Sequence, residues 1–234
     1  MKFHNRSHAG VLLAQKMSNF LFDKKNTLVL AIGRGGVPVA FEIAQKFHLP
    51  LDVILVKKIG SPLYPELAIG TISEGNEVFY NDVLLEELGL KINSIKPITE
   101  QVFYELKKMG KNLRQNHEPL VLTHKDIVLV DDGINTGSTI HSVLQVLNER
   151  KVNKIFIVVP VASAEALLVL EKKVDSIVVL KSPNPVYSIA EWYKDFKQVE
   201  VSDVVKILNN YYKNTSFSDD LEKEKTHYME GHGN

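Results

Sequence analysis

The residues best suited to chemistry lie in one short stretch, which runs from Asp131 to Thr139 and directly follows the apolar run 127–130. The adjacent carboxylates of Asp131 and Asp132 can accept hydrogen bonds from a pair of sugar hydroxyls. The loop 135–139 opens a predicted helix, and free backbone amides at a helix start bind anions such as phosphate. The stretch therefore offers one site for a ribose and one for a phosphate, which together suit a ribose 5-phosphate.

Other interpretations of the glycine-rich segments are less specific. Asp132 could cap the helix while Gly133 and Gly137 serve only the turn. A P-loop is excluded because Gly133 and Gly137 have the wrong spacing and no lysine follows them. A dinucleotide-binding turn at 33–38 lacks the third glycine and the acidic residue after the next strand, although an NADP-binding oxidoreductase would tolerate lysines there.

The elements that must position these residues follow an alternating pattern. Short apolar runs at 28–32, 53–56, 127–130, 155–159 and 177–180 predict buried strands, and amphipathic segments at 7–22, 37–47, 138–150, 164–172 and 202–212 predict helices. Such alternation is typical of an α/β protein with a doubly wound, mostly parallel sheet. The region 59–126 is less regular, with a hairpin predicted from 68–73 and 77–80 and helices predicted at 82–88 and 99–114.

The stretch from Val128 through Asp131, Asp132 and Gly133 to Thr139 resembles the signature of type I phosphoribosyltransferases, which bind phosphoribosyl pyrophosphate (PRPP). The resemblance extends over residues 3–208 and implies that family's fold, with a small hood region. It implies that Asp131 and Asp132 bind the ribose hydroxyls. The 5-phosphate would then be held by the loop residues, which are Gly133, Asn135, Thr136, Gly137, Ser138 and Thr139.

Two further segments match that family in position. Gly33, Arg34, Gly35 and Gly36 follow the first strand, where the family has its pyrophosphate loop, and Arg34 could make bidentate phosphate contacts. Lys57 and Lys58 end the second predicted strand, where members of the family carry a basic residue. The segment 60–66 stands in the place of a mobile loop that closes over the reaction centre. The competing interpretations are that 33–36 is only a structural turn and that Lys57 and Lys58 are only solvated side chains.

The resemblance implies a Mg²⁺-dependent transferase that moves ribose 5-phosphate from PRPP to a nitrogen acceptor and releases pyrophosphate. Mg²⁺ would be bound mainly through PRPP, without a dedicated set of protein ligands. A PRPP-binding regulatory protein without turnover is the alternative, because the same loop would serve both.

The acceptor is expected under the hood, for which the candidate segment is 182–199. Tyr187, Trp192 and Asp195 are the candidate acceptor residues, although Trp192 and Phe196 could instead pack the hood onto the core. In the family members that use 6-oxopurines, an aspartate stands where this chain has Asn135. An amide cannot accept a proton at neutral pH, so we expect poor turnover of hypoxanthine and guanine.

Composition limits the remaining function classes. The chain has 234 residues with 28 basic and 28 acidic side chains, and this balance offers no bulk attraction for nucleic acid. It has no cysteine, no apolar run long enough for a membrane span and a polar first ten residues, so we expect a cytoplasmic protein. His4 and His8 lack further metal ligands nearby.

We expect one domain over 1–212 and a disordered tail over 213–234, and a homo-oligomer is compatible with this organisation.

Overall fold

The computed structural model, which describes residues 2–115 and 117–214, is built on a five-stranded sheet. Its strands lie in the order β2 (Leu51–Ile54), β1 (Thr27–Ile32), β6 (Asp126–Val130), β7 (Lys154–Val161) and β8 (Ser176–Lys181). All four neighbouring pairs are parallel. The predicted α/β fold with a doubly wound parallel sheet is confirmed.

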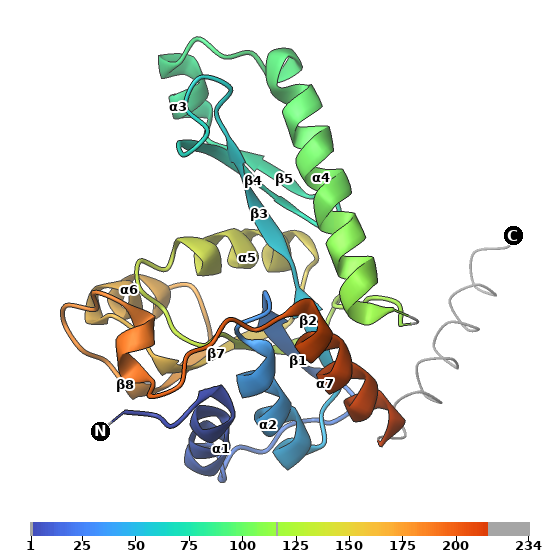
Figure 1. Cartoon of the computed structure of the whole chain (residues 1–234), viewed down its shortest axis with the longest axis vertical. Coiled ribbons are helices and arrows are strands. Elements are labelled where there is room, and N and C mark those ends of the chain that lie inside the picture. The colour runs from blue at the N-terminus through green and yellow to red at the C-terminus, as the bar shows by residue number, and fades with distance from the viewer. Residues whose placement is uncertain (1, 116, 215–234) are drawn as a thin grey trace, which may run out of the picture.

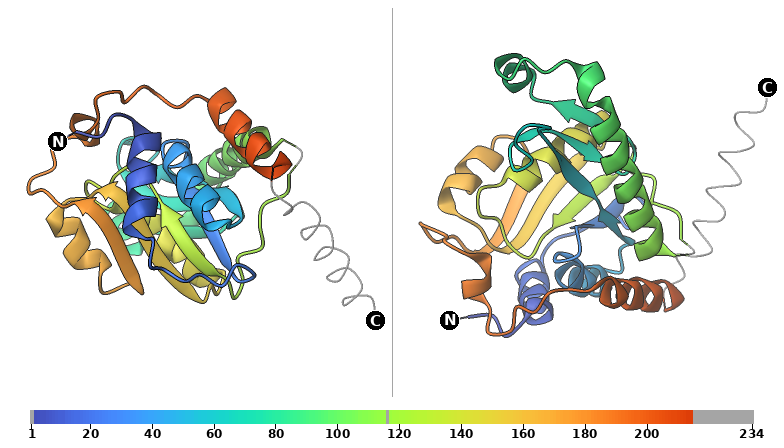
Figure 2. Two further views of the ribbon diagram at one scale, coloured as in Figure 1. Left: turned by 90° about the horizontal axis from the view of Figure 1, so that it is seen from below. Right: turned by 45° about the horizontal axis from the view of Figure 1, so that its top comes forward.

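Helices cover both faces of this sheet because its strands are apolar on both sides. Val29 and Ala31 of β1 pack toward α1 (Arg6–Lys16), α2 (Val37–Phe47) and α7 (Val201–Lys213). Leu28 and Leu30, which alternate with them, pack toward α5 (Ser138–Glu149) and α6 (Ala164–Leu170). Figure 2 shows α1 and α2 side by side on the first of these faces.

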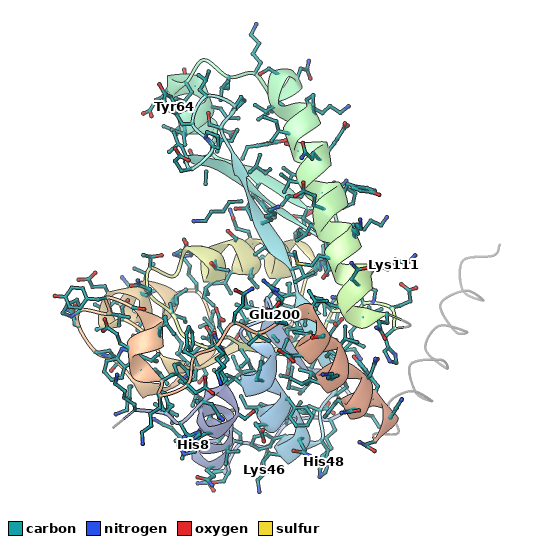
Figure 3. All side chains as sticks on the ribbon, in the orientation of Figure 1. His8, Lys46, His48, Tyr64, Lys111 and Glu200 are labelled. Carbon is teal, nitrogen blue, oxygen red and sulfur yellow. The ribbon has the colours of Figure 1, made fainter. Side chains whose placement is uncertain are left out.

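A second lobe, which we call the arm, projects from the α5 side of the sheet (Figure 1). It contains an antiparallel sheet of β3 (Val56–Gly60), β4 (Ala68–Ser73) and β5 (Val78–Tyr80), with α3 (Asp82–Glu87) and α4 (Ile92–Arg114). Its own core includes Ile59, Ile72 and Ile95. Tyr64, in the turn between β3 and β4, lies at the far end of the arm (Figure 3).

The predicted hairpin of β4 and β5 is confirmed, but two other predictions for this region are wrong. The run 53–56 is not one strand, since the main-sheet strand ends at Ile54 and Val56 begins a strand of the arm. The helix predicted from residue 99 begins at Ile92 and includes Pro97. Burial of Ile95 in the core of the arm offsets the cost of a proline within a helix.

Buried ion pairs fasten the arm at its base. The Arg114 Nε–H at the end of α4 donates to Asp52 Oδ1 of β2 at 2.7 Å, and its two terminal nitrogens donate to Glu74 at 2.6 and 2.7 Å. Burial alone would lower the pKa of Arg114, but the charges of Asp52 and Glu74 raise it above its ordinary value. A second pair joins Arg150, after α5, to Glu77 at 2.7 Å. The arm is thus fixed to both β2 and α5.

The segment 182–199, which we call the strap, crosses the carboxyl edge of the sheet and contains the short helix η1 (Ile189–Trp192). It is paired with the start of the chain, because Phe3 N–H donates to the Trp192 carbonyl and Lys194 N–H donates to the Phe3 carbonyl, each at 2.8 Å. Most of the predicted tail, residues 215–234, lies outside the described residues, and Lys213 itself ends α7. Across the described ranges, none of the helices combines the length and the apolar character that a membrane span requires.

Candidate functional site

The two glycine-containing loops meet at the carboxyl edge of the sheet. Strands β1 and β6 are parallel neighbours, with Ala31 opposite Val130, so the loops that follow them adjoin. A Cβ on Gly35 would lie 2.5 Å from Asp132 Oδ2, and a Cβ on Gly36 would lie 2.7 Å from the Val130 carbonyl oxygen. Because real Cβ atoms do not approach so closely, glycine is required at position 36, where the neighbour is backbone, and a Cβ at position 35 would displace the Asp132 carboxylate.

The first loop, 33–36, has the character of an anion site. Among the described residues, the amides of Arg34 and Gly35 donate to no protein acceptor, and the Arg34 guanidinium forms no hydrogen bond or ion pair. The side chain of Arg34 is half-buried. Free amides beside an unpaired guanidinium can bind a phosphate group with charge-assisted hydrogen bonds.

The acidic pair lies directly after β6. Asp131 Oδ1 accepts a hydrogen bond from the Asp132 N–H at 2.8 Å. Burial raises the pKa of Asp131 well above its ordinary value, and the negative charge of Asp132 raises it further. Two full negative charges are therefore unfavourable here unless a cation or a hydrogen-bond donor is close to the carboxylates.

One such cation is Arg6, from the first turn of α1. Its Nε–H donates to Asp132 Oδ2 at 2.7 Å, with side-chain exposures of 11% for Arg6 and 16% for Asp132. The buried Tyr193 of the strap donates its hydroxyl hydrogen to the Asp132 carbonyl at 2.6 Å. Sequence reasoning missed both contacts with Asp132, because nothing in the local pattern around Arg6 or Tyr193 marks a partner that is 126 or 61 positions away.

The second loop, 134–139, is held by hydrogen bonds to Val161 and Ser163, while several of its backbone amides have no acceptor among the described residues. Ile134 N–H donates to the Val161 carbonyl at 2.8 Å, and the Ser163 hydroxyl donates to the Asn135 carbonyl at 2.5 Å. Gly137 has a φ of 77° and precedes the first residue of α5. In the described part of the chain, the amides of Thr136, Gly137 and Thr139 donate to no protein acceptor. Free amides at the start of a helix such as α5 can bind an anion.

Lys57 and Lys58 lie in β3 of the arm and not at the end of a main-sheet strand, which corrects the predicted position. Lys57 Nζ pairs with Glu105 Oε2 of α4 at 2.7 Å, and both side chains are about half exposed. Lys58 lies opposite Thr71, whose hydroxyl is 3.0 Å from that of Ser142 in α5. Since successive side chains of a strand point to opposite faces, only Lys58 lies on the α5 face of the arm.

The candidate acceptor residues of the strap are not gathered in one place. Tyr187 is 80% exposed. Trp192 and Phe196 pack against a small core that contains Phe3 and Tyr193. The Asp195 N–H donates to the His4 carbonyl at 2.9 Å, and its carboxylate lies 3.5 Å from Lys197 Nζ.

A cavity of about 320 Å³ adjoins the second loop. It is lined by residues 135–137, by the start of α6, by His141 and by the strap residues 184–186. Burial and the charge of Lys173 lower the pKa of His141. The cavity adjoins the free amides directly, because Thr136 and Gly137 line it together with Asn135.

Comparison with known proteins gives consistent matches. The model of the phosphoribosyl transferase domain matches residues 5–195. A Mycobacterium tuberculosis protein with a provisional designation as a phosphoribosyl transferase is 32% identical over 207 residues, in each of two strains. That match covers 88% of this chain and 46% of the relative, so the chain spans about half the relative's length. A Thermus thermophilus protein of known crystal structure is 32% identical, with a TM-score of 0.77 over 90% of this chain and 99% of that one.

Proposed function

The chain belongs to the phosphoribosyl transferase domain family, and from that premise we propose that it transfers ribose 5-phosphate from PRPP to a nitrogen acceptor and releases pyrophosphate. The observation that carries this proposal is the meeting of the two loops at Gly35 and Asp132. One candidate anion-binding loop lies against Asp132, and the other follows the two carboxylates in the chain. PRPP has the matching order of groups, with a phosphate, a ribose and a pyrophosphate.

Each part of PRPP is assigned to one segment. The amides of 135–139 would hold the 5-phosphate, and the carboxylates of Asp131 and Asp132 would accept hydrogen bonds from the ribose hydroxyls. The Arg34 side chain and the backbone amides of Arg34 and Gly35 would bind the pyrophosphate, and Gly36 would let this loop lie against the end of β6. Lys58 is assigned to the pyrophosphate side in preference to Lys57, because Lys57 is already paired with Glu105 on the opposite face of β3.

The reaction breaks the bond between C1 of the ribose and the pyrophosphate oxygen, and the electron pair leaves with pyrophosphate. Positive charge then develops at C1, as in other glycosyl transfers, and the lone pair of the acceptor nitrogen forms the new bond. Arg34 and the free amides of its loop would stabilise the charge on the leaving oxygen. The two carboxylates would orient the ribose and stabilise the positive charge near C1.

Mg²⁺ fits the oxygen-rich donor set at the acidic pair. The raised pKa of Asp131 reflects burial and repulsion that a nearby dication would relieve. Among the described residues, no three acidic or histidine side chains come together as a metal site, so PRPP oxygens and water would have to complete the coordination. Bound in this way, Mg²⁺ would neutralise charge on the departing pyrophosphate.

Release of pyrophosphate from Mg²⁺-PRPP in the presence of a panel of purines, pyrimidines and small amines tests the proposal. We expect at least one acceptor to support steady-state release, and we expect the double variant Asp131→Asn, Asp132→Asn to lose PRPP binding in calorimetry while staying folded. PRPP binding without release for any acceptor would favour the regulatory alternative. No PRPP binding by the parent protein, or equal binding by the double variant, would refute the assignment.

A further inference from the structure

We infer that Arg6 is a positioning residue for ribose recognition, which acts by holding the carboxylate of Asp132 in one orientation. The inference rests on the proposed function, because it concerns the same ribose site. Arg6 lies outside the loops that match the family signature, and it reaches the site from the other end of the chain.

The contact leaves a defined part of Asp132 for a ligand. The Arg6 Nε–H binds Oδ2 at 2.7 Å, and the Asp132 carbonyl is held separately by the Tyr193 hydroxyl at 2.6 Å. A carboxylate with one oxygen bound can no longer rotate freely, so its Oδ1 keeps a fixed direction. Both side chains are largely buried, which strengthens the ion pair relative to one in water. Oδ1 is therefore the atom that we assign to a ribose hydroxyl.

Arg6 is itself held by contacts with the strap. Its Cζ lies 3.7 Å from the centre of the Phe196 ring, and its terminal NH1 donates to the Lys197 carbonyl at 2.8 Å. The helix that carries Arg6 is capped by Asn5, whose side chain accepts a hydrogen bond from His8 N–H at 2.8 Å. The guanidinium therefore has three different partners and little freedom to leave Asp132.

The electrostatics agree with this role. Among the described residues, Arg6 is the cation that is ion-paired with the acidic pair. Asp131, Asp132, Arg6 and Tyr193 are the titratable groups that act on one another there, and burial raises the pKa of Tyr193. Removing Arg6 would leave two carboxylates side by side without a protein counter-charge.

Arg6 contacts the acidic pair and not the loop 33–36, and this separation gives a specific test. Calorimetry with ribose 5-phosphate, PRPP and inorganic pyrophosphate, each with Mg²⁺, would compare Arg6→Gln with the parent protein. We expect Arg6→Gln to weaken ribose 5-phosphate and PRPP binding by at least about tenfold, the effect of losing a hydrogen bond to a charged group. Pyrophosphate affinity should change by less than about twofold, as for independent sites.

Two further variants separate positioning from a general effect on the fold. Arg6→Lys should restore part of the lost affinity, because an ammonium keeps the charge but cannot contact Asp132 and the Lys197 carbonyl together. Arg150→Gln is the matched control, since Arg150 forms an ion pair of the same 2.7 Å length with Glu77, away from the site. It should leave the affinity for ribose 5-phosphate unchanged, whatever it does to stability.

The outcomes distinguish this inference from the proposed function. If the parent protein binds neither PRPP nor ribose 5-phosphate, the proposed function fails and the role of Arg6 fails with it. If the parent binds both and Arg6→Gln binds them equally well or more tightly, only the role of Arg6 is refuted. An equal loss of pyrophosphate binding, or no recovery in Arg6→Lys, would also overturn it, because either result indicates a general structural effect.

Discussion

The Asp132 N–H donates to the Asp131 carboxylate at 2.8 Å, so the two acidic residues are joined by a hydrogen bond as well as separated by like charge. Burial is the first cause that raises the pKa of Asp131, and the charge of Asp132 is the second. The ionised form of Asp131 therefore lowers the free energy of unfolding.

We expect Asp131→Asn to raise the melting temperature at neutral pH while it weakens PRPP binding. The amide keeps an oxygen that can accept from the Asp132 N–H but removes the buried charge. Because the folded-state pKa of Asp131 is raised, its protonated form favours the folded state at low pH, and this contribution is lost as pH rises through that pKa. The gain from Asp131→Asn should therefore be absent below about pH 4, the pKa range of an aspartate in an unfolded chain, and should grow as pH rises.

Thermal melts between pH 4 and pH 8 would check this prediction, with Asp132→Asn as the control. That substitution removes the negative charge that pairs with Arg6 and should not stabilise the protein. A lower melting temperature for Asp131→Asn at pH 8 would contradict the prediction.

We expect the loss of Arg114 to lower the free energy of unfolding, because this residue joins the base of the arm to β2. Arg114→Met leaves Asp52 and Glu74 without a buried cation, and Arg114 and Asp52 have side-chain exposures of only 4%. Breaking a buried ion pair in this way costs about 3–5 kcal/mol of unfolding free energy. Lys57→Met removes a pair that is about half exposed and should cost at most about 1 kcal/mol. Urea denaturation of the two variants would measure the difference. Equal losses of unfolding free energy would show that the ion pairs of Arg114 with Asp52 and Glu74 do not secure the arm.

The two adjacent lysines should differ in their effect on ligand binding. Lys58 lies on the face of β3 that looks toward α5, whereas Lys57 is paired with Glu105 on the other face. We expect Lys58→Met to weaken pyrophosphate binding by about tenfold, the effect of one charge-assisted contact, and Lys57→Met to leave it unchanged. Calorimetry with Mg²⁺ and pyrophosphate would decide, and a larger loss in Lys57→Met would reverse the assignment.

Hypoxanthine and guanine should be poor acceptors. Asn135 lines the cavity beside the second loop, and its amide cannot take a proton from a purine ring nitrogen. Asn135→Asp should gain some activity toward both purines, since the Asn135 backbone carbonyl would still be held by Ser163. Spectroscopic assays of nucleotide formation from each purine would test this. Rapid conversion by the unmodified protein would show that a group other than residue 135 accepts the proton from the purine ring nitrogen.

The features that could be predicted from the sequence are those formed by residues that follow one another directly in the chain. The strand 127–130, the pair Asp131 and Asp132 and the loop 135–139 follow one another directly, so their order alone implies a ribose site beside an anion site. The same is true of 33–36, where three glycines mark a loop that another backbone can approach. Uninterrupted apolar runs identified β1, β6 and β7, because strands that are buried on both faces carry apolar side chains at nearly every position.

The features that only the tertiary structure decided depend on which distant elements pack together. Arg6 and Asp132 are 126 positions apart, and Arg114 and Asp52 are 62 apart. No local pattern distinguishes these arginines from the solvated charges elsewhere in the chain. The roles of Lys57 and Lys58 also depended on tertiary structure, because the break after Ile54 moves both lysines into the arm. Side-chain direction then separates them, since neighbours on a strand point to opposite faces and only packing decides which face meets the site.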